Sequence, residues 1–386
     1  MTTGRRSPKL VAAVLAFAVG AAGVAGTVRG QTLKTTARHA ILIDASTEAV
    51  LFAKAADVPM PPASMSKLMT IDMVFERLKS GALSMDDKFL VSEKAWRMGG
   101  SKMFVKVGDR VSVQDLLRGI IVQSGNDACI VIAEGLSGSE DAFAEQMTRK
   151  AREIGLVNST FRNATGWPAD GHAMSARDLA TLALRIIREF PQYYPIFKEI
   201  SFTYNGIKQG NRNPLLYRNF GADGLKTGHT EASGYGLVAS AERNGRRLVL
   251  VLNGLSSMRE RSSESARLLD WGFRETATYA LFRKGETVEN AKVWLGMQPS
   301  VPLVIDRDLA LTIPRAARSD MTVKVVYRDP LPAPIKAKTA VARLVVAVPG
   351  RPPLELPLMA GADVEQLGLF GRVNAAVRYL IWGSPG

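Results

Sequence analysis

The chain of 386 residues contains a single cysteine and only three histidines. Cys129 cannot form an internal disulfide, so the fold must depend on its hydrophobic core, and the apolar stretch ACIVIAEG around it predicts an inert, buried thiol. The histidines, His39, His172 and His229, are far apart, and the chain holds neither an HExxH helix nor a CxxC pair. We therefore expect no metal site and no cofactor.

The first 30 residues differ in composition from the rest of the chain. Arg5, Arg6 and Lys9 precede the apolar run LVAAVLAFAVGAAGVAG, and small residues suitable for cleavage follow between Ala25 and Gly30. This order predicts a secretory signal peptide over residues 1–30. An uncleaved membrane anchor is the alternative, because the run approaches the length that spans a bilayer, but its small, weakly apolar residues favour cleavage.

The sequence also lacks the basic, aromatic-interleaved runs that are typical of nucleic-acid binding. Its formal charge is nevertheless +14, and four of these positive charges lie in the first 30 residues, which leaves +10 for the rest. For an exported protein this charge favours an anionic partner, either an acidic membrane surface or a carboxylate-rich polymer. Charge alone does not distinguish between the two.

The chain has no internal repeat and no low-complexity tract. Its length of 386 residues and its hydrophobic content of 46% predict one large and one small domain. Short apolar strands are expected at residues 40–43 and 50–53, around a polar turn. Apolar residues recur at helical spacing in four segments, 64–83, 113–124, 139–154 and 175–189. Strands return after residue 211, with an RNGR hairpin turn, and a helix follows at SSESARLLDWGF. This order predicts an α+β core over residues 31–276, in which helices cover a sheet.

The C-terminal part of the chain has a different texture. Short β-like runs split by prolines predict a separate small β domain over residues 277–363. The final segment, 364–386, has apolar residues at helical spacing beside basic and interfacial aromatic ones: Leu367, Phe370, Val373, Val377, Leu380 and Ile381, with Arg372, Arg378, Tyr379 and Trp382. Such a helix could lie in a membrane surface or dock on the β domain, and the pattern alone leaves both open.

A hydroxyl and an amine stand three residues apart in PPASMSKLMT, where a helix is expected to begin. Positions i and i+3 share one face of a helix, so the Lys67 amine can reach the Ser64 hydroxyl. Lysine can act as a base only if burial or nearby cations lower its pKa well below about 10.4. The helix start also directs free backbone N–H groups at an anion forming beside Ser64, as one half of an oxyanion hole.

A lone Ser-x-x-Lys pair often arises by chance and is weak evidence for a catalytic site. Two other stretches strengthen the interpretation. VQSGND contains Ser124 and Asn126, and DGLKTGHT contains Lys226, Thr227 and Gly228. The set of three in this order is the one found in penicillin-binding proteins and class A β-lactamases. Ser124 can relay a proton to a leaving amine, and the Asn126 carboxamide can hold a substrate peptide group. Lys226 and Thr227 can hold a substrate carboxylate, while Gly228 leaves room for a peptide along the strand edge.

On these motifs the chain resembles the serine-type D-Ala-D-Ala carboxypeptidases, low-molecular-mass penicillin-binding proteins of the peptidase S11 type. The resemblance covers most of the chain and includes ASMSKLMT, SGNDA, NSTFRNATGW followed by HAMSARDLA, NRNPLLYRN, DGLKTGHTEASGY, ESARLLDWGF, LPAPI and LELPLMAG. It implies a β-lactamase/transpeptidase-like core, with an antiparallel sheet flanked by helices and a helical subdomain, followed by a small all-β C-terminal domain. It also implies that the terminal helix is a membrane anchor. One departure is IKAKTAVARL, where the family usually has a glycine-containing stretch.

The resemblance implies a role for each site residue. The acylated nucleophile, its proton acceptor and the third catalytic group would be Ser64, Lys67 and Ser124. Lys226 would bind the terminal carboxylate of the substrate, and the backbone N–H of His229 would complete the oxyanion hole. Arg212 and Arg261 match family arginines near the substrate end, although surface salt bridges are the alternative for both.

The implied reaction removes the terminal D-alanine from peptidoglycan stem pentapeptides through an acyl-enzyme, which β-lactams would trap. The implied location is the periplasm, with peripheral attachment to the inner membrane. A β-lactamase would need a further carboxylate in a Glu-x-x-x-Asn pattern, and between Ser124 and Lys226 none occurs, since Glu153 is followed four residues later by Val157. A D,D-endopeptidase or transpeptidase shares all three motifs. A wall-binding or penicillin-sensing module without turnover is the non-enzymatic alternative.

Overall fold

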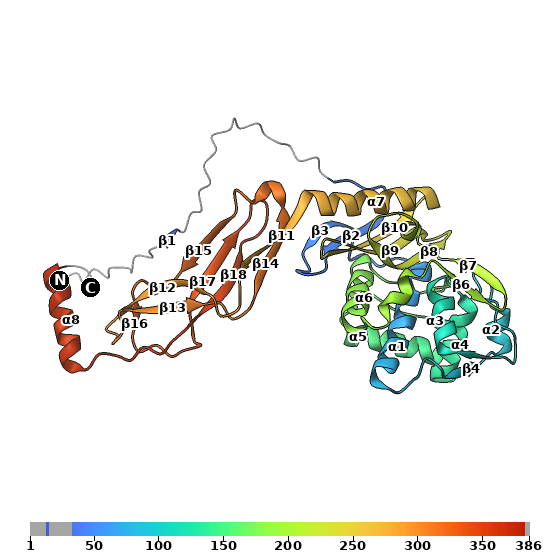
Figure 1. Cartoon of the computed structure of the whole chain (residues 1–386), viewed down its shortest axis with the longest axis horizontal. Coiled ribbons are helices and arrows are strands. Elements are labelled where there is room, and N and C mark those ends of the chain that lie inside the picture. The colour runs from blue at the N-terminus through green and yellow to red at the C-terminus, as the bar shows by residue number, and fades with distance from the viewer. Residues whose placement is uncertain (1–12, 15–32, 383–386) are drawn as a thin grey trace, which may run out of the picture. The chain divides into compact units, whose positions relative to one another are not determined.

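The structure is a computed structural model that describes residues 13–14 and 33–382 of the chain (Figure 1). The described residues divide into two compact units, one over residues 33–274 and one that holds residues 275–382 together with residues 13–14. The predicted signal peptide falls almost entirely outside the described residues. Only its residues 13–14 are described, and they form the short strand β1, which pairs with β15 of the second unit.

The first unit is built on a five-stranded antiparallel sheet in the order β3-β2-β10-β9-β8. Its strands are β2 (His39–Asp44), β3 (Val50–Lys54), β8 (Ala222–Thr230), β9 (Gly234–Arg243) and β10 (Arg246–Leu255). The two predicted hairpins, β2–β3 and β9–β10, are confirmed. Asn244 and Gly245 take positive φ in the second turn, as a tight hairpin requires. Strand β8 lies at the edge of the sheet.

Both faces of this sheet are covered by helices, and the alternation of side chains along β10 shows why. Leu248, Leu250 and Leu252 enter a core with Leu268 and Leu269 of helix α7 (Met258–Glu275), which Figure 1 shows above the sheet. The intervening Val249 and Val251 enter a second core with the helical part of the unit. The helices of that part are α1 (Lys67–Ser80), α2 (Glu93–Arg97), α3 (Val113–Ile121), α4 (Asn126–Ser137), α5 (Glu140–Glu153) and α6 (Ala176–Glu189).

Serine caps fix the starts of three predicted helices. Ser112, Ser139 and Ser175 each accept a hydrogen bond from a backbone N–H three residues later, at the starts of α3, α5 and α6. The helix predicted from residue 64 begins instead at Lys67, because Ala63–Ser66 form a 3-10 turn, η1. Other short elements surround this core: β4 (Lys88–Leu90), β5 (Arg110–Ser112), β6 (Ser201–Tyr204), β7 (Ile207–Gly210), η2 (Tyr194–Lys198) and η3 (Pro214–Tyr217).

The second unit is the predicted all-β domain, with a core of its own around Leu303, Leu344 and Leu358. Its larger sheet has the order β1-β15-β17-β18-β13-β12-β16, and β11 pairs with β14 beside it. Its elements are β11 (Thr276–Phe282), β12 (Thr287–Trp294), β13 (Ser300–Val304), β14 (Leu309–Pro314), η4 (Arg315–Ala317), β15 (Thr322–Val326), β16 (Leu331–Pro332), β17 (Ala340–Ala347) and β18 (Leu354–Ala360).

The stretch IKAKTAVARL, which lacks the glycine usual in the family, contains a residue with positive φ. Lys338 adopts φ of 63°, in the left-handed region that glycine favours. Its backbone N–H donates to the carbonyl of Ala360 at 2.8 Å, just before β17 begins. The turn is therefore kept, with a lysine in a conformation that costs a non-glycine residue about 1 kcal/mol.

The C-terminal helix α8 occupies Leu369–Trp382, whereas the sequence predicts a helix from residue 364. Val364 is instead buried in the core of the β domain and bridges to Ile335. Residues 383–386 lie outside the described part of the chain. Among the described residues, no helix combines the length and the hydropathy needed to cross a bilayer.

Candidate active site

The Ser64 and Lys67 side chains meet at the junction of η1 and α1. In a 3-10 turn, side chains at i and i+3 are eclipsed, so the predicted contact forms although Ser64 precedes the helix. Lys67 Nζ lies 2.7 Å from Ser64 Oγ. Lys67 is fully buried, whereas Ser64 is partly exposed. The hydroxyl can thus meet a ligand while the amine behind it is shielded from water.

Lys67 has two further partners, and both can only accept. Its Nζ donates to Asn126 Oδ1 at 2.7 Å and to the Thr165 carbonyl at 2.5 Å. Burial lowers the pKa of Lys67 to about 8, and repulsion by Arg212 contributes, while Asp127 acts in the opposite direction. A neutral amine has two N–H groups and one lone pair. With Asn126 and Thr165 taking the two N–H groups, the lone pair is left for the Ser64 hydroxyl.

Ser124 comes from the connection between α3 and α4, and Asn126, the first residue of α4, reaches Lys67 from the same side. Ser124 is buried and has φ of 67°, a strained conformation for serine of the kind that clusters at functional sites. Its Oγ has no hydrogen-bond partner within the described residues. The Asn126 carboxamide is fixed at both ends, because Oδ1 accepts from Lys67 and Nδ2 donates to the Gly99 carbonyl at 2.8 Å.

The edge strand β8 forms the opposite wall, with Lys226, Thr227 and Gly228 buried along it. A Cβ on Gly228 would lie 2.9 Å from the Pro62 carbonyl and 3.2 Å from Ala63 Cβ. The glycine therefore permits close packing of β8 against η1. Glycine at this position is therefore explained by packing against η1, whereas the sequence suggested that it leaves room for a substrate peptide.

Cationic groups converge around Lys226. Its Nζ donates to the Thr227 carbonyl at 3.2 Å. Burial lowers the pKa of Lys226 well below its ordinary value, and repulsion by Lys67, Arg212 and Arg261 lowers it further. Across the described residues, no ion pair joins Lys226 to a carboxylate. Within the described residues, the cluster therefore has no anion that balances the charge of Lys226.

The two arginines of this cluster do not take part in the surface salt bridges considered as the alternative. Within the described part of the chain, neither Arg212 nor Arg261 is paired with a carboxylate, and Arg261 Nε is buried without a partner. Burial lowers the pKa of both arginines. The Arg261 guanidinium lies over the Tyr235 ring, 5.8 Å from its centroid, and the His229 ring stacks on the same tyrosine at 3.9 Å. The predicted site residues thus come from η1, α1, the α3–α4 connection, the first residue of α4, strand β8, the segment between β7 and η3, and helix α7, which carries Arg261.

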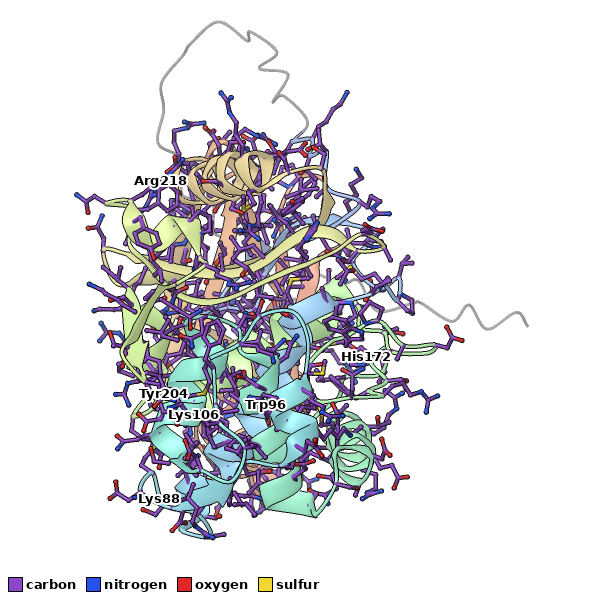
Figure 2. The ribbon with its side chains drawn as sticks, turned by 90° about the vertical axis from the view of Figure 1, so that its right-hand side faces the viewer. Lys88, Trp96, Lys106, His172, Tyr204 and Arg218 are labelled. Carbon is purple, nitrogen blue, oxygen red and sulfur yellow. The ribbon has the colours of Figure 1, made fainter. Side chains whose placement is uncertain are left out.

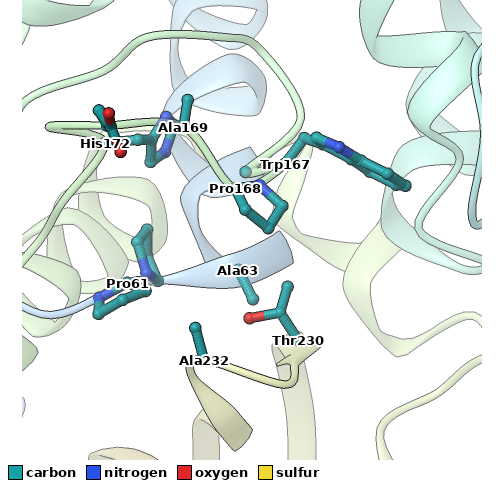
Figure 3. A pocket seen from close by; sticks show the side chains of 11 residues that line it. Pro61, Ala63, Trp167, Pro168, Ala169, His172, Thr230 and Ala232 are labelled. Carbon is teal, nitrogen blue, oxygen red and sulfur yellow. The ribbon is translucent and has the colours of Figure 1, made fainter.

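A cavity of about 290 Å³ opens beside Ala63, the residue that precedes Ser64 (Figure 3). It is lined by Pro61, Pro62 and Ala63, by residues 166–170 and His172, by Thr230 at the end of β8 and by Ala232 beyond it. Figure 3 shows the loop with Trp167, Pro168 and Ala169 on one side of it and Thr230 and Ala232 on the other. Burial lowers the pKa of His172 to about 4, so this imidazole is neutral at neutral pH.

Metal-ligand and thiol chemistry have no visible place here. Within the described residues, no cluster of three or more histidine, cysteine, aspartate or glutamate side chains could hold a metal ion. Cys129 is buried on α4, as predicted, and burial raises its pKa to about 12. It is therefore a neutral thiol, and its conversion to a thiolate nucleophile is disfavoured.

The carbonyl partners of the site could not be predicted from the residue types. Thr165 and Gly99 contribute backbone oxygens, for which the residue type gives no signal. The Asp127 carboxylate was not predicted either, and it accepts the backbone N–H groups of residues 103–105 at 2.9 to 3.3 Å. These contacts hold the loop before α3 against the start of α4.

Comparisons with known proteins show the family of this chain. The sequence profile of D-alanyl-D-alanine carboxypeptidases matches residues 26–256, and that of the C-terminal domain of penicillin-binding protein 5 matches residues 277–366. The chain is 39% identical to the D-alanyl-D-alanine carboxypeptidase DacC of Escherichia coli over 345 residues, covering 87% of this chain and 86% of the relative.

Solved structures show the same likeness in three dimensions. Penicillin-binding protein 5 from Haemophilus influenzae superposes with a TM-score of 0.77 at 36% identity, covering 87% of this chain and 99% of that one. The D-alanyl-D-alanine carboxypeptidase DacD from Francisella tularensis gives a TM-score of 0.80 at 29% identity, covering 91% of this chain and 99% of that one.

Proposed function

We propose that this chain, which belongs to the D-alanyl-D-alanine carboxypeptidase family, removes the terminal D-alanine from peptidoglycan stem peptides through an acyl-enzyme on Ser64. The observation that carries this assignment of roles is the 2.7 Å contact between Ser64 Oγ and the Lys67 amine, whose pKa falls to about 8 through burial. A serine hydroxyl becomes a nucleophile only beside such a base.

Acylation begins with a proton transfer from Ser64 Oγ to the Lys67 lone pair. Ser64 then attacks the carbonyl carbon between the last two D-alanines, and the oxyanion is held by backbone N–H groups at Ser64 and at His229. As the peptide bond breaks, the proton passes from Lys67 through the Ser124 hydroxyl to the leaving amine of D-alanine. Water later hydrolyses the Ser64 ester and releases the shortened peptide. The buried Ser124 Oγ, unpartnered within the described residues, supports this relay.

The carboxylate of the departing D-alanine is assigned to the cationic cluster of Lys226, Arg212 and Arg261, with the Thr227 hydroxyl beside it. Together with Lys67 these three groups make four cations that repel one another. Lys67, Lys226 and Arg261 are buried, whereas Arg212 is exposed. A bound carboxylate relieves this repulsion. It also raises the pKa of Lys226 towards its ordinary value. The site therefore favours a peptide that ends in a free carboxylate one residue beyond the reacting bond.

Product analysis separates the related activities. We expect the protein to release D-alanine from a stem pentapeptide faster than it cleaves a crosslinked peptide dimer, and to be acylated by penicillin. Mass spectrometry of products from both substrates, with the acylated peptide mapped to residues 61–69, is the measurement. Faster cleavage of the dimer would make it a D,D-endopeptidase. Labelling without any release of D-alanine would favour the penicillin-sensing alternative.

The rate of acylation should depend on pH through Lys67. Below a pKa of about 8 the amine is protonated and cannot accept the Ser64 proton, so the rate falls about tenfold for each pH unit lost. Above this pKa the rate levels off. The falling part of this pH–rate profile is its acidic limb. Because Arg212 lowers the pKa of Lys67, Arg212→Ala should move the acidic limb to higher pH, whereas Arg149→Ala on α5 should not. Stopped-flow acylation by a fluorescent penicillin measures the limb, and an unmoved limb in Arg212→Ala would contradict the coupling.

The proposed location is the periplasm, after removal of residues 1–30, with α8 attached to the membrane surface. Large apolar side chains on this helix are exposed, namely Leu369, Phe370, Val373 and Val377. Phe370 is 91% exposed, which is costly in water and favourable at a lipid interface. We expect deletion of residues 365–386 to release the mature protein from membranes and to leave peptidase activity within about twofold of wild type. Sedimentation with membranes is the measurement, and unchanged sedimentation would refute the anchor.

A further inference from the structure

We infer that Trp167 and Arg97 form a subsite for a carboxylate-bearing segment of the substrate, upstream of the reacting bond. This inference rests on the proposed function, because it assumes that the leaving carboxylate lies at the Lys226 cluster. The subsite is a second cavity, distinct from the one beside Ser64.

The second cavity has a volume of about 660 Å³ and shares a wall with the first. Trp167, Pro168 and Ala169 line both cavities, so this loop separates them. The other lining residues come from α2 and the segment after it, from the start of α5 and from the loop before Gly166: Lys94, Arg97, Met98, Gly99, Glu140, Asn163 and Thr165. A peptide could therefore pass over Trp167 from one cavity to the other.

Trp167 is held rigidly although half of it is exposed. Its backbone N–H donates to Thr165 Oγ1 at 3.1 Å and to Asn163 Oδ1 at 3.2 Å, and its carbonyl accepts from Asn163 Nδ2 at 2.9 Å. Its ring lies so close to Gly100 that a Cβ there would be 2.8 Å from it. The side chain is nevertheless 47% exposed. A fixed, exposed aromatic face offers apolar contact to a ligand at little cost in conformational entropy.

The position of this cavity matches the upstream part of the substrate. Gly99 and Thr165, which line it, are the residues whose carbonyls accept from Asn126 and Lys67. Lys226 lines neither cavity, and the same holds for the two arginines beside it. With the terminal carboxylate at Lys226 and a peptide group at Asn126, the chain upstream must continue towards Trp167.

The charges around the cavity identify the group that it would bind. Lys94 Nζ pairs with Glu140 at 2.9 Å, and the second oxygen of Glu140 accepts the Ala164 N–H at 3.2 Å, so both charges are satisfied. Arg97 pairs with Glu93 at 2.6 Å, but these side chains are 70% and 63% exposed and Glu93 does not line the cavity. Such exposed i,i+4 pairs are weak. Arg97 is thus available for a substrate carboxylate, which its guanidinium can bind at two oxygens.

Three substrates test the subsite: a stem pentapeptide with a free carboxylate upstream of the D-alanine pair, the same peptide with that carboxylate amidated, and a short N-acyl-D-alanyl-D-alanine. Arg97→Ala should raise KM about fivefold for the carboxylate peptide alone. Trp167→Ala should raise KM roughly tenfold for both pentapeptides and by less than about twofold for the short substrate. Trp167→Phe should restore most of this loss. kcat and penicillin acylation should be unchanged throughout.

The chain offers matched controls for both variants. Trp96, which is labelled in Figure 2, is 45% exposed and lines neither cavity. Arg149 forms another exposed i,i+4 pair, with Glu145. Trp96→Ala and Arg149→Ala should behave as wild type on all three substrates. Equal effects of Arg97→Ala on the free and amidated peptides, or no effect of Trp167→Ala, would overturn the subsite. A wild-type protein that releases D-alanine from none of the three would instead overturn the proposed function.

Discussion

The Ser64→Ala variant is expected to take no covalent penicillin label and to release D-alanine at least about a thousandfold more slowly than wild type. The reason is chemical, since alanine has no oxygen to form the ester. The variant should remain folded, because Ser64 is partly exposed and, within the described residues, its hydroxyl is hydrogen-bonded to the Lys67 amine alone. Intact-protein mass spectrometry after penicillin treatment, together with a thermal melt, measures both expectations.

Ser66 provides a matched control two residues away on the same turn. Its Oγ is fully buried and has no hydrogen-bond partner within the described residues. Removal of an unsatisfied buried hydroxyl is neutral or slightly stabilising, so Ser66→Ala should melt at or above the wild-type temperature and take a full label. If Ser64→Ala were labelled, or if Ser66→Ala lost its label as completely, the nucleophile would not be Ser64.

Gly166→Ala is expected to destabilise the protein by about 3 kcal/mol or more and to abolish acylation. Gly166 has φ of 78°, and a Cβ there would lie 2.0 Å from the Ala63 carbonyl and 2.6 Å from Ser66 Oγ. The carbonyl belongs to the η1 backbone, which cannot move without displacing Ser64. The left-handed conformation adds about 1 kcal/mol to the cost of this collision. Denaturant unfolding and the acylation rate are the measurements.

Gly171→Ala is a control that carries the cost of positive φ for alanine without a collision between the new Cβ and the backbone. Gly171 lies in the same loop with φ of 75°, but the nearest atom to its Cβ would be Nε of the flexible Arg162 side chain at 3.3 Å. Only the conformational cost of about 1 kcal/mol is expected, with acylation retained. A loss of the same size in both variants would contradict the proposed contact between Gly166 and η1.

Local patterns predicted much of the core. The hairpins, the capped helices and the contact between Ser64 and Lys67 all depend on residues close in sequence, where periodicity, turn residues and side-chain spacing act directly. The all-β domain was predicted from its short strands and prolines, and the structure confirms it. The residues of the three motifs are distant in sequence, and only their joint occurrence suggested that they would meet.

Other features left no pattern to find. Helix α4 was not predicted, because residues 126–133 are buried without interruption and an evenly apolar run has no helical period. The 3-10 turn before α1 shifted the expected helix start, since short 3-10 and α segments share the same spacing signals. The partners of Lys67 and Asn126 on the neighbouring loops are backbone carbonyls, whose placement depends on how distant segments pack.

The cluster of positive groups near Lys226 makes binding depend on where the carboxylate end of the peptide lies. If the peptide bond placed at Ser64 had no carboxylate one residue beyond it, the cations near Lys226 would stay unbalanced. Such a peptide would rarely form a productive complex. Unbalanced charge in the empty enzyme would then direct cleavage to the last peptide bond of a chain. Each product again ends in a carboxylate one residue beyond its last peptide bond, so this charge fixes where cleavage occurs and sets no limit on how many residues are removed.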